Sequence, residues 1–407
     1  MNDEVALRPA TTDDFAAVCD LLDTVFHEDT DGEPRERIAE IYEPERSLAC
    51  VDGSSLVGHT AILSRDLTVP GAVVPAAHVT GVGVAPTHRR RGLLTRMMHR
   101  QLQDVAAAGR EPIAVLWASE TTIYPRFGYG PASSRLMLQI ANREVRLPAP
   151  SDVPAGRLRM ADPASVLTDL GKVYEQLRPE RVGWSNRDDR WWRTTISDPK
   201  DHRGGATPLR AVVHDTPHGP SGYALWRVKD DWTDRGPNGE VQVQEMVAAD
   251  PQTYVALWRF LLGIDLTRSV TMRRGALDEP LRFLVDEPRR LGTSLGDGLW
   301  VRIVDLPAAL AARRYATPVD VVLEVTDPLL EGNNGRWRLT GGPDAARCVP
   351  TTDQADLSCS VTELGAAYLG ATSLSVLAAA GRVRMLTGND PSVAFGWHRA
   401  PSPTDSF

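Results

Sequence analysis

The sequence predicts a mixed α/β protein of three domains, and three observations lead to this fold class. A chain of 407 residues is too long for one core, because domains commonly hold about 100–200 residues. Its composition, with 42% apolar and 24% charged residues, is that of a globular protein and excludes disordered, collagen-like and coiled-coil classes. Strand and helix patterns alternate in the first 118 residues, which indicates a mixed sheet covered by helices.

The first domain, which we place at residues 1–150, shows its elements in order. A short strand at residues 5–7 precedes Thr11 and Asp14, whose spacing is that of a capping box at the start of a helix. Asp52 and Gly53 stand between two apolar runs and predict a hairpin. The apolar patterns that follow predict a strand at residues 79–84, an amphipathic helix at 93–108 and a strand at 113–118.

A proline-rich stretch at residues 145–158 marks the next boundary. We place the second domain at residues 151–299, with strands at 209–213, 222–228 and 241–248 and a helix at 254–262. The third domain, at residues 300–407, is expected to contain a strand at 319–325 and helices at 307–313, 361–369 and 373–380.

Charge, hydropathy and cysteine usage exclude several classes of function. The formal net charge of −8 argues against nucleic acid as a partner, because binding it needs a basic surface. No run of about 18 apolar residues is present, so we expect no membrane span. The acidic, polar first residues lack the pattern of a signal peptide, and we expect a cytoplasmic protein. Four scattered cysteines without a C-x-x-C pair predict neither a disulfide scaffold nor a metal site.

The most informative stretch, residues 79–96, joins the end of a strand to a basic loop and the start of a helix. A pyrophosphate needs several N–H donors, and a helix N-terminus offers unpaired N–H groups and a positive dipole end. Gly92 permits close approach of the backbone, and Arg89, Arg90 and Arg91 can add charge-assisted hydrogen bonds. Neither G-x-G-x-x-G nor G-x-x-x-x-G-K-S/T is present, which argues against dinucleotide and nucleoside triphosphate loops. A solvated arginine loop is an equal alternative.

Longer motifs decide between these alternatives by resemblance. Arg89 and Gly92 match the first and fourth positions of Arg/Gln-x-x-Gly-x-Gly/Ala, the central pattern of the GNAT acetyltransferase superfamily, although Leu94 replaces the usual glycine or alanine. In the actinobacterial Eis family, leucine is normal at the position of Leu94. Several segments of this chain together resemble that family: residues 85–94, 118–120, 123–132, 223–228, 298–310, 368–370 and Phe407. This resemblance implies two GNAT-like α/β domains in tandem, a C-terminal sterol-carrier-protein-like α+β domain, acetyl-CoA as acetyl donor and assembly as a homohexamer.

The same resemblance, carried over position by position, implies a cofactor site. It implies that Val82, Gly83 and Val84 bind the pantetheine. The pyrophosphate would be bound by Arg90, Arg91, Gly92, Leu93, Leu94 and Thr95, and Ser119 and Glu120 would lie beside the cofactor at the end of the next strand. The first three would pair with the pantetheine amides as an added strand does. In the second domain the corresponding helix begins after Asp250, whose charge would repel phosphate, so we expect one cofactor per chain.

The catalytic groups are implied in the same way. Tyr124 matches the family's general acid, and a tyrosine pKa of about 10 suits a proton donor to a CoA thiolate. Tyr129 is expected to be structural. The carboxylate of Phe407 is implied as the general base. On the acceptor side, Glu28 aligns with an acidic substrate contact and Trp117 offers a cation–π face.

Three functions stay open at this point. The resemblance favours N-acetylation of amines on cationic acceptors such as aminoglycosides, polyamines and lysine side chains. Glu28, Asp29, Asp31 and Glu33 form either an anionic rim for such acceptors or a solvated acidic loop. The alternatives are an acetyltransferase for one metabolite or one protein lysine, and a lipid- or sterol-binding protein that acts through its C-terminal domain.

Overall fold

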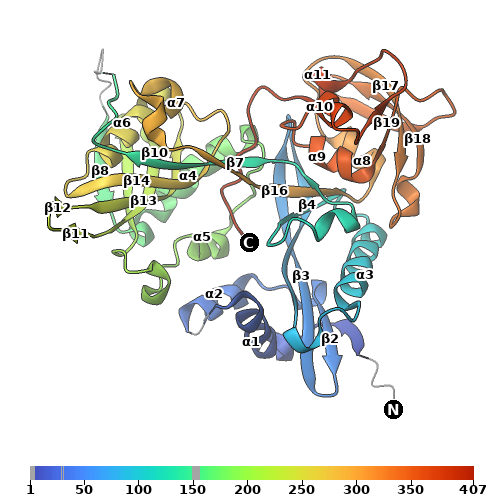
Figure 1. Cartoon of the computed structure of the whole chain (residues 1–407), viewed down its shortest axis with the longest axis horizontal. Coiled ribbons are helices and arrows are strands. Elements are labelled where there is room, and N and C mark those ends of the chain that lie inside the picture. Colours follow the sequence, from blue (N-terminus) through green and yellow to red (C-terminus); the bar gives the residue numbers. More distant parts are fainter. Residues whose placement is uncertain (1–4, 29, 31, 149–155) are drawn as a thin grey trace. The chain divides into compact units, whose positions relative to one another are not determined.

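The computed structural model describes residues 5–28, 30, 32–148 and 156–407, and it divides into two compact units (Figure 1). The first unit consists of residues 1–133, 298–401 and 405–407, and the second of residues 134–297 and 402–404. Each unit contains a seven-stranded sheet, and the first also contains a five-stranded sheet. The expected domain limit at residue 150 lies outside the described residues.

The larger sheet of the first unit has the order β1-β2-β3-β4-β5-β16-β6. Its strands are β1 (Ala6–Pro9), β2 (Leu48–Asp52), β3 (Ser55–Val69), β4 (Ala72–Val84), β5 (Ile113–Trp117), β6 (Gly130–Pro131) and β16 (Leu299–Ile303). The hairpin between β2 and β3 turns at Gly53, which has φ +60°, as the Asp-Gly pair predicts. Only β4 and β5 run parallel, and all other neighbours in this sheet pair antiparallel.

Helices α1 (Phe15–Phe26) and α3 (Leu93–Ala108) flank β3 and β4 (Figure 1). The expected capping box is present, because Thr11 and Asp14 satisfy each other's backbone N–H groups before α1 begins. Helix α3 buries one face, including Met97, Met98 and Leu102, against the sheet, which confirms the predicted amphipathic helix. The expected acidic loop is partly helical, since α2 (Glu33–Ile41) begins there with a proline in its first turn.

The remainder of the first unit is an α+β arrangement with a sheet of order β19-β18-β17-β20-β21. Its elements are α8 (Leu306–Ala312), β17 (Val319–Thr326), β18 (Gly335–Gly341), β19 (Ala346–Pro350), β20 (Leu357–Ser360), α9 (Val361–Ala367), α10 (Leu374–Ala379), β21 (Arg384–Met385) and α11 (Ser392–Phe395). A fully buried ion pair of 2.8 Å between Arg302 of β16 and Asp327 fixes this part to the larger sheet.

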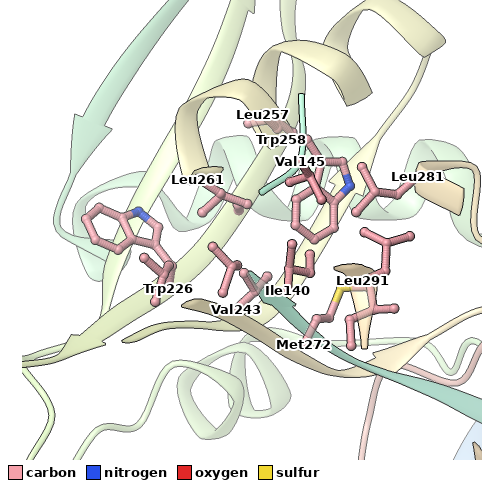
Figure 2. Packing of buried hydrophobic residues seen from close by; sticks show 14 of the residues in the cluster. Ile140, Val145, Trp226, Val243, Leu257, Trp258, Leu261, Met272, Leu281 and Leu291 are labelled. Carbon is pink, nitrogen blue, oxygen red and sulfur yellow. The ribbon is translucent and has the colours of Figure 1, made fainter. Parts of the chain in front are cut away.

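The second unit contains a sheet of order β15-β7-β14-β13-β10-β9-β8. Its elements are β7 (Ser134–Ala141), β8 (Arg157–Ala161), α4 (Leu167–Leu177), α5 (Asp189–Thr195), β9 (Arg210–Thr216), β10 (Gly219–Lys229), β11 (Trp232–Thr233), β12 (Gly236–Pro237), β13 (Gly239–Ala248), α6 (Pro251–Leu262), β14 (Thr267–Gly275), α7 (Leu281–Leu284) and β15 (Ser294–Asp297). Figure 2 shows the core on one face, where Trp258 and Leu261 of α6 lie over Val243, Ile140 and Met272 of the strands.

Strand pairing crosses the expected domain limits at two places. Residues 134–141, which we place in the first domain by sequence, form β7 and pair with β14 and β15 of the second unit. Residues 300–303, which we place in the third domain, belong to β16 and pair with β5 of the first unit. The reason is that strand pairing is set by partners distant in sequence, whereas prolines mark only the connecting loops.

Two structural features bear on the excluded classes. No helix within the described ranges is long and apolar enough to cross a membrane. The described residues also contain no group of three or more His, Cys, Asp or Glu side chains placed to hold a metal ion.

Candidate active site

A cavity of about 460 Å³ opens in the first unit beside the end of β4 and the start of α3, a volume suited to a small-molecule site. The predicted residues that line it are Val82, Gly83, Val84, Arg90, Gly92, Leu93, Leu94, Thr95, Ser119, Glu120 and Tyr124. The structure thus brings together side chains that lie up to 42 residues apart in the sequence.

Sequence reasoning missed several lining residues, namely Val25, Phe26, His88, Ile123 and Arg126. Val25 and Phe26 are the last two residues of α1. Their helical spacing from Leu22 was the one sequence signal that could have predicted that they face the sheet. They reach the cavity because β4 carries glycine beneath them: a Cβ at Gly83 would stand 3.3 Å from Leu22 and 3.4 Å from Val25.

The N-terminus of α3 is open to an anion. Gly92 caps this helix in a left-handed conformation (φ +78°), and neither a capping side chain nor an acidic residue occupies its first turn. The first N–H groups of a helix have no partner within the helix, and Leu93, Leu94 and Thr95, which line the cavity, have no side-chain cap that competes for theirs. Arg90 also has positive φ (65°), a conformation that is costly for a residue with a side chain and concentrates at functional sites.

Positive charge dominates the lining of the cavity. Arg89, Arg90 and Arg126 line it, and Glu120 is the acidic residue among the described lining residues. Arg91 does not line the cavity, and its Nη1 lies 3.9 Å from a carboxylate oxygen of Asp52. A cationic cavity with open helical N–H groups is complementary to phosphate groups.

The β4 edge supplies the second recognition element. Strand β4 pairs with β5 only from Ala76–Ile113 to His78–Val115, and beyond that point the two strands diverge. The edge of β4 at Val82, Gly83 and Val84 therefore lines the cavity instead of pairing with β5. Unpaired strand edges present N–H and C=O groups to an extended ligand, which can bind as an added strand.

Tyr124 is the tyrosine among the described residues that line the cavity. It begins a short 3₁₀ helix, Tyr124–Phe127, is 4% exposed, and lines the cavity together with Ser119. Burial raises the pKa of Tyr124, while the Ser119 hydrogen bond partly opposes the rise. Tyr129 packs edge-on against Tyr124 with ring centroids 6.0 Å apart, but it is fully buried in the core and does not line the cavity.

The last residues of the chain lie along the same two strands. Asp405 forms an ion pair of 2.6 Å with Arg65 of β3, and both side chains are almost fully buried. The Phe407 ring lies 4.7 Å from that of His78 on β4. Burial, with the nearby charge of Arg65, lowers the pKa of His78 to about 3, so this imidazole is neutral at physiological pH. Phe407 is not among the residues that line the cavity.

The two residues proposed for acceptor contact also stand outside the cavity lining. Glu28 is exposed and follows Phe26, which lines the cavity, by two residues. Trp117 ends β5 and is half-buried, two residues before Ser119. The neighbouring acidic positions Asp29 and Asp31 lie outside the described residues.

In the second unit the corresponding helix N-terminus is closed. Helix α6 follows β13 as α3 follows β4, but its N-cap is Asp250. The Asp250 carboxylate accepts hydrogen bonds of 2.9 Å from the N–H groups of Gln252 and Thr253. An N-cap carboxylate both satisfies these donors and places a negative charge where a phosphate would bind.

Comparison with known proteins agrees with this geometry. Residues 6–132 and residues 183–303 each match the acetyltransferase (GNAT) domain family, and residues 306–401 match the sterol carrier protein domain family. The N-acetyltransferase Eis of Mycobacterium tuberculosis is 39% identical over 82% of this chain and 80% of its own length. The chain belongs to the Eis family of GNAT N-acetyltransferases. Its fold class is thereby confirmed: two GNAT-like domains and a sterol-carrier-like domain.

Other relatives of this Eis-family chain span nearly its whole length. An uncharacterised N-acetyltransferase of Streptomyces avermitilis is 48% identical over 87% of both chains. The crystal structure of Eis1 from Mycobacterium abscessus superimposes with a TM-score of 0.84 at 31% identity and covers 99% of this chain and 100% of that one. The protein is therefore an N-acetyltransferase, an enzyme class whose GNAT members use acetyl-CoA as co-substrate.

Proposed function

We propose that this Eis-family enzyme transfers the acetyl group of acetyl-CoA to amines of cationic acceptors at the cavity of its first unit. The observation that carries the proposal is the open N-terminus of α3 beside the unpaired edge of β4. Leu93, Leu94 and Thr95 would bind the pyrophosphate through their N–H groups, with Arg89 and Arg90 adding charge. Val82, Gly83 and Val84 would bind the pantetheine arm, whose thioester supplies the acetyl group.

The two GNAT-like domains differ in the feature that binds phosphate, and we propose one acetyl-CoA site per chain. Asp250 fills the N-terminus of α6, whereas no side chain caps α3. Titration calorimetry with acetyl-CoA should give a stoichiometry of one per chain. Asp250→Asn should leave that stoichiometry unchanged, while Gly92→Val should weaken binding at least about tenfold, because a β-branched residue is strained at φ +78° and blocks close approach. Two sites per chain would contradict the proposal.

The proposed chemistry assigns one proton to each catalytic group. Tyr124 stays protonated at neutral pH because burial raises its pKa, and it would donate its proton to the departing thiolate. The Phe407 carboxylate would accept the proton that the attacking amine loses. Ser119, which lines the cavity beside Tyr124, would hold the phenol in place by a hydrogen bond.

For the acceptor we propose polyamines, aminoglycosides and lysine side chains. Glu28 is exposed two residues after the lining residue Phe26, and Trp117 lies at the end of β5, so these residues would offer an anionic group and an aromatic ring to an amine. The net charge of −8 also favours approach of polycations. We further propose, from the family resemblance, that the protein is cytoplasmic and assembles as a homohexamer.

A thiol-release assay with a panel of acceptors tests this proposal. Aminoglycosides, polyamines and lysine peptides should each release CoA from acetyl-CoA, with polycations giving the highest kcat/KM. Glu28→Gln should raise KM for polycations more than for a lysine peptide, because the lost charge matters most for the more highly charged acceptor. Activity on one acceptor alone would favour a narrow metabolite or protein-lysine acetyltransferase. Activity on none of them, with saturable fatty-acid binding, would favour lipid binding.

A further inference from the structure

Strand β4 bulges directly before the edge that lines the cavity. Its register against β3 shifts there, so that Gly81 and Val82 together oppose the single residue Thr60. A β-bulge bends its strand and changes the direction of the residues that follow. The position of residues 82–84, which line the cavity, therefore depends on how the bulge is held.

Gly81 provides the backbone conformation of the bulge. Its φ of +57° lies in the left-handed region, where a residue with a side chain is strained. A Cβ at this position would also stand 3.1 Å from Nδ1 of His59 and 3.3 Å from Cδ1 of Leu22 in α1. Glycine is therefore required here, and its backbone lies directly against the His59 ring.

His59 of β3 hydrogen-bonds to the bulge. The residue is 1% exposed, and its Nδ1 lies 2.8 Å from the carbonyl oxygen of Gly81. The other ring nitrogen, Nε2, lies 3.3 Å from the hydroxyl oxygen of Tyr42. Burial lowers the pKa of His59 to about 4, so the ring is neutral at physiological pH and carries one N–H group. Because a carbonyl can only accept, Nδ1 donates to Gly81, and Nε2 accepts from Tyr42.

This hydrogen bond selects one conformation of the bulge. Glycine has more conformational freedom than any other residue, and a bulged residue is left outside the regular pairing of its strands. The His59 bond should therefore favour the observed bulge over conformations that turn the Gly81 carbonyl away by about tenfold, as is typical of one intramolecular hydrogen bond.

We propose that His59 is a positioning residue for acetyl-CoA: by holding the Gly81 carbonyl, it fixes residues 82–84 in the position that pairs with the pantetheine amides, a role that rests on the proposed binding of pantetheine at this edge. His59 is not among the described residues that line the cavity, so it acts through the backbone and does not touch the ligand. His59, Gly81, Tyr42 and the cavity lining all belong to the first unit.

Two substitutions of His59 separate the hydrogen bond from the bulk of the ring. His59→Leu removes both nitrogens, whereas His59→Asn keeps an N–H donor near the position of Nδ1. We expect His59→Leu to weaken acetyl-CoA binding about tenfold in titration calorimetry, and His59→Asn to stay within about threefold of the unmodified chain. Tyr42→Phe, which removes the partner of Nε2, should also stay within about threefold.

The phosphorylated adenosine diphosphate half of coenzyme A is the second probe. It contains the pyrophosphate but no pantetheine, so it should bind at the N-terminus of α3 and be insensitive to the β4 edge. We expect His59→Leu to bind it within about twofold of the unmodified affinity, which also shows that the variant is folded.

Three results would overturn the role of His59: equal losses for acetyl-CoA and its nucleotide half, equal losses in His59→Leu and His59→Asn, or no loss in His59→Leu. Failure of the proposed site looks different. Acetyl-CoA and the nucleotide half would then bind the unmodified chain with equal affinity, because no contact to pantetheine would exist.

Discussion

Tyr124→Phe should lower kcat by about two to four orders of magnitude, the usual contribution of a general acid. The change removes only the phenol oxygen of a buried residue that lines the cavity. Binding of acetyl-CoA uses the α3 N-terminus and the β4 edge, so its KM should stay within about twofold of the unmodified value. Steady-state kinetics with a saturating polyamine measure both quantities.

Tyr129→Phe is the matched control for this change. The Tyr129 ring packs against Tyr124, but its hydroxyl makes no hydrogen bond to any described residue and does not reach the cavity lining. We expect its kcat to equal that of the unmodified enzyme within about twofold. Equal losses in the two variants would show that packing, and not proton donation, explains the effect at Tyr124.

The pH profile gives an independent check on Tyr124. A general acid is active in its protonated form, and burial raises the pKa of this phenol above its ordinary value of about 10. The protonated fraction is therefore complete at neutral pH and declines only as pH rises through the raised pKa. A loss of kcat between pH 7 and 9 that disappears in Tyr124→Phe would contradict the assignment of a raised pKa.

Removal of Phe407 should have a similarly large effect, a fall in kcat of about two to four orders of magnitude with acetyl-CoA binding intact. An α-carboxylate has a pKa of about 3.5, so it is charged at neutral pH and can accept the proton of the attacking amine. Adding one glycine after Phe407 should act like the deletion, because it keeps a carboxylate but moves it by up to about 3.6 Å. Single-turnover kinetics measure the chemical step directly.

Two controls make the Phe407 result interpretable. Intact mass spectrometry establishes which residue carries the free carboxylate in the purified protein. Phe407→Leu keeps the carboxylate and loses the ring contact with His78, so its kcat should fall far less than that of the deletion. A deletion and a Phe407→Leu variant with the same residual kcat would indicate that the ring, and not the carboxylate, is needed.

Local features of the site could be predicted from the sequence because each depends on neighbours in the chain. The capping box at Thr11 and Asp14 formed as the spacing predicted. The open N-terminus of α3 is formed by consecutive residues, Gly92 to Thr95. The order of a strand end, a basic loop and a helix start in the sequence was therefore enough to predict it. Asp250 lies directly before the proline that begins α6, and this pair was sufficient to predict that the N-terminus of α6 is capped by a carboxylate.

Side-chain direction and strand exchange were not predictable in this way. Arg91 lies in the same basic loop as Arg90, yet of these two only Arg90 lines the cavity, while Arg91 lies 3.9 Å from Asp52 of a distant hairpin. Strands β7 and β16 pair in sheets other than those their sequence positions suggest. Neither outcome leaves a signal in the local pattern of apolar residues, since that pattern specifies a buried face but not its partner.

The sequence by itself thus determined the family and the number of acetyltransferase-like domains, and it predicted which of the two helix N-termini carries no acidic cap, since short motifs and helix caps encode these features locally. The tertiary structure alone decided where the end of the chain binds. Arg65 meets Asp405 across 340 positions, and Arg187 meets Thr404 across 217. Such contacts depend on how separately folded elements pack, because a buried charge must find a partner wherever the fold places one.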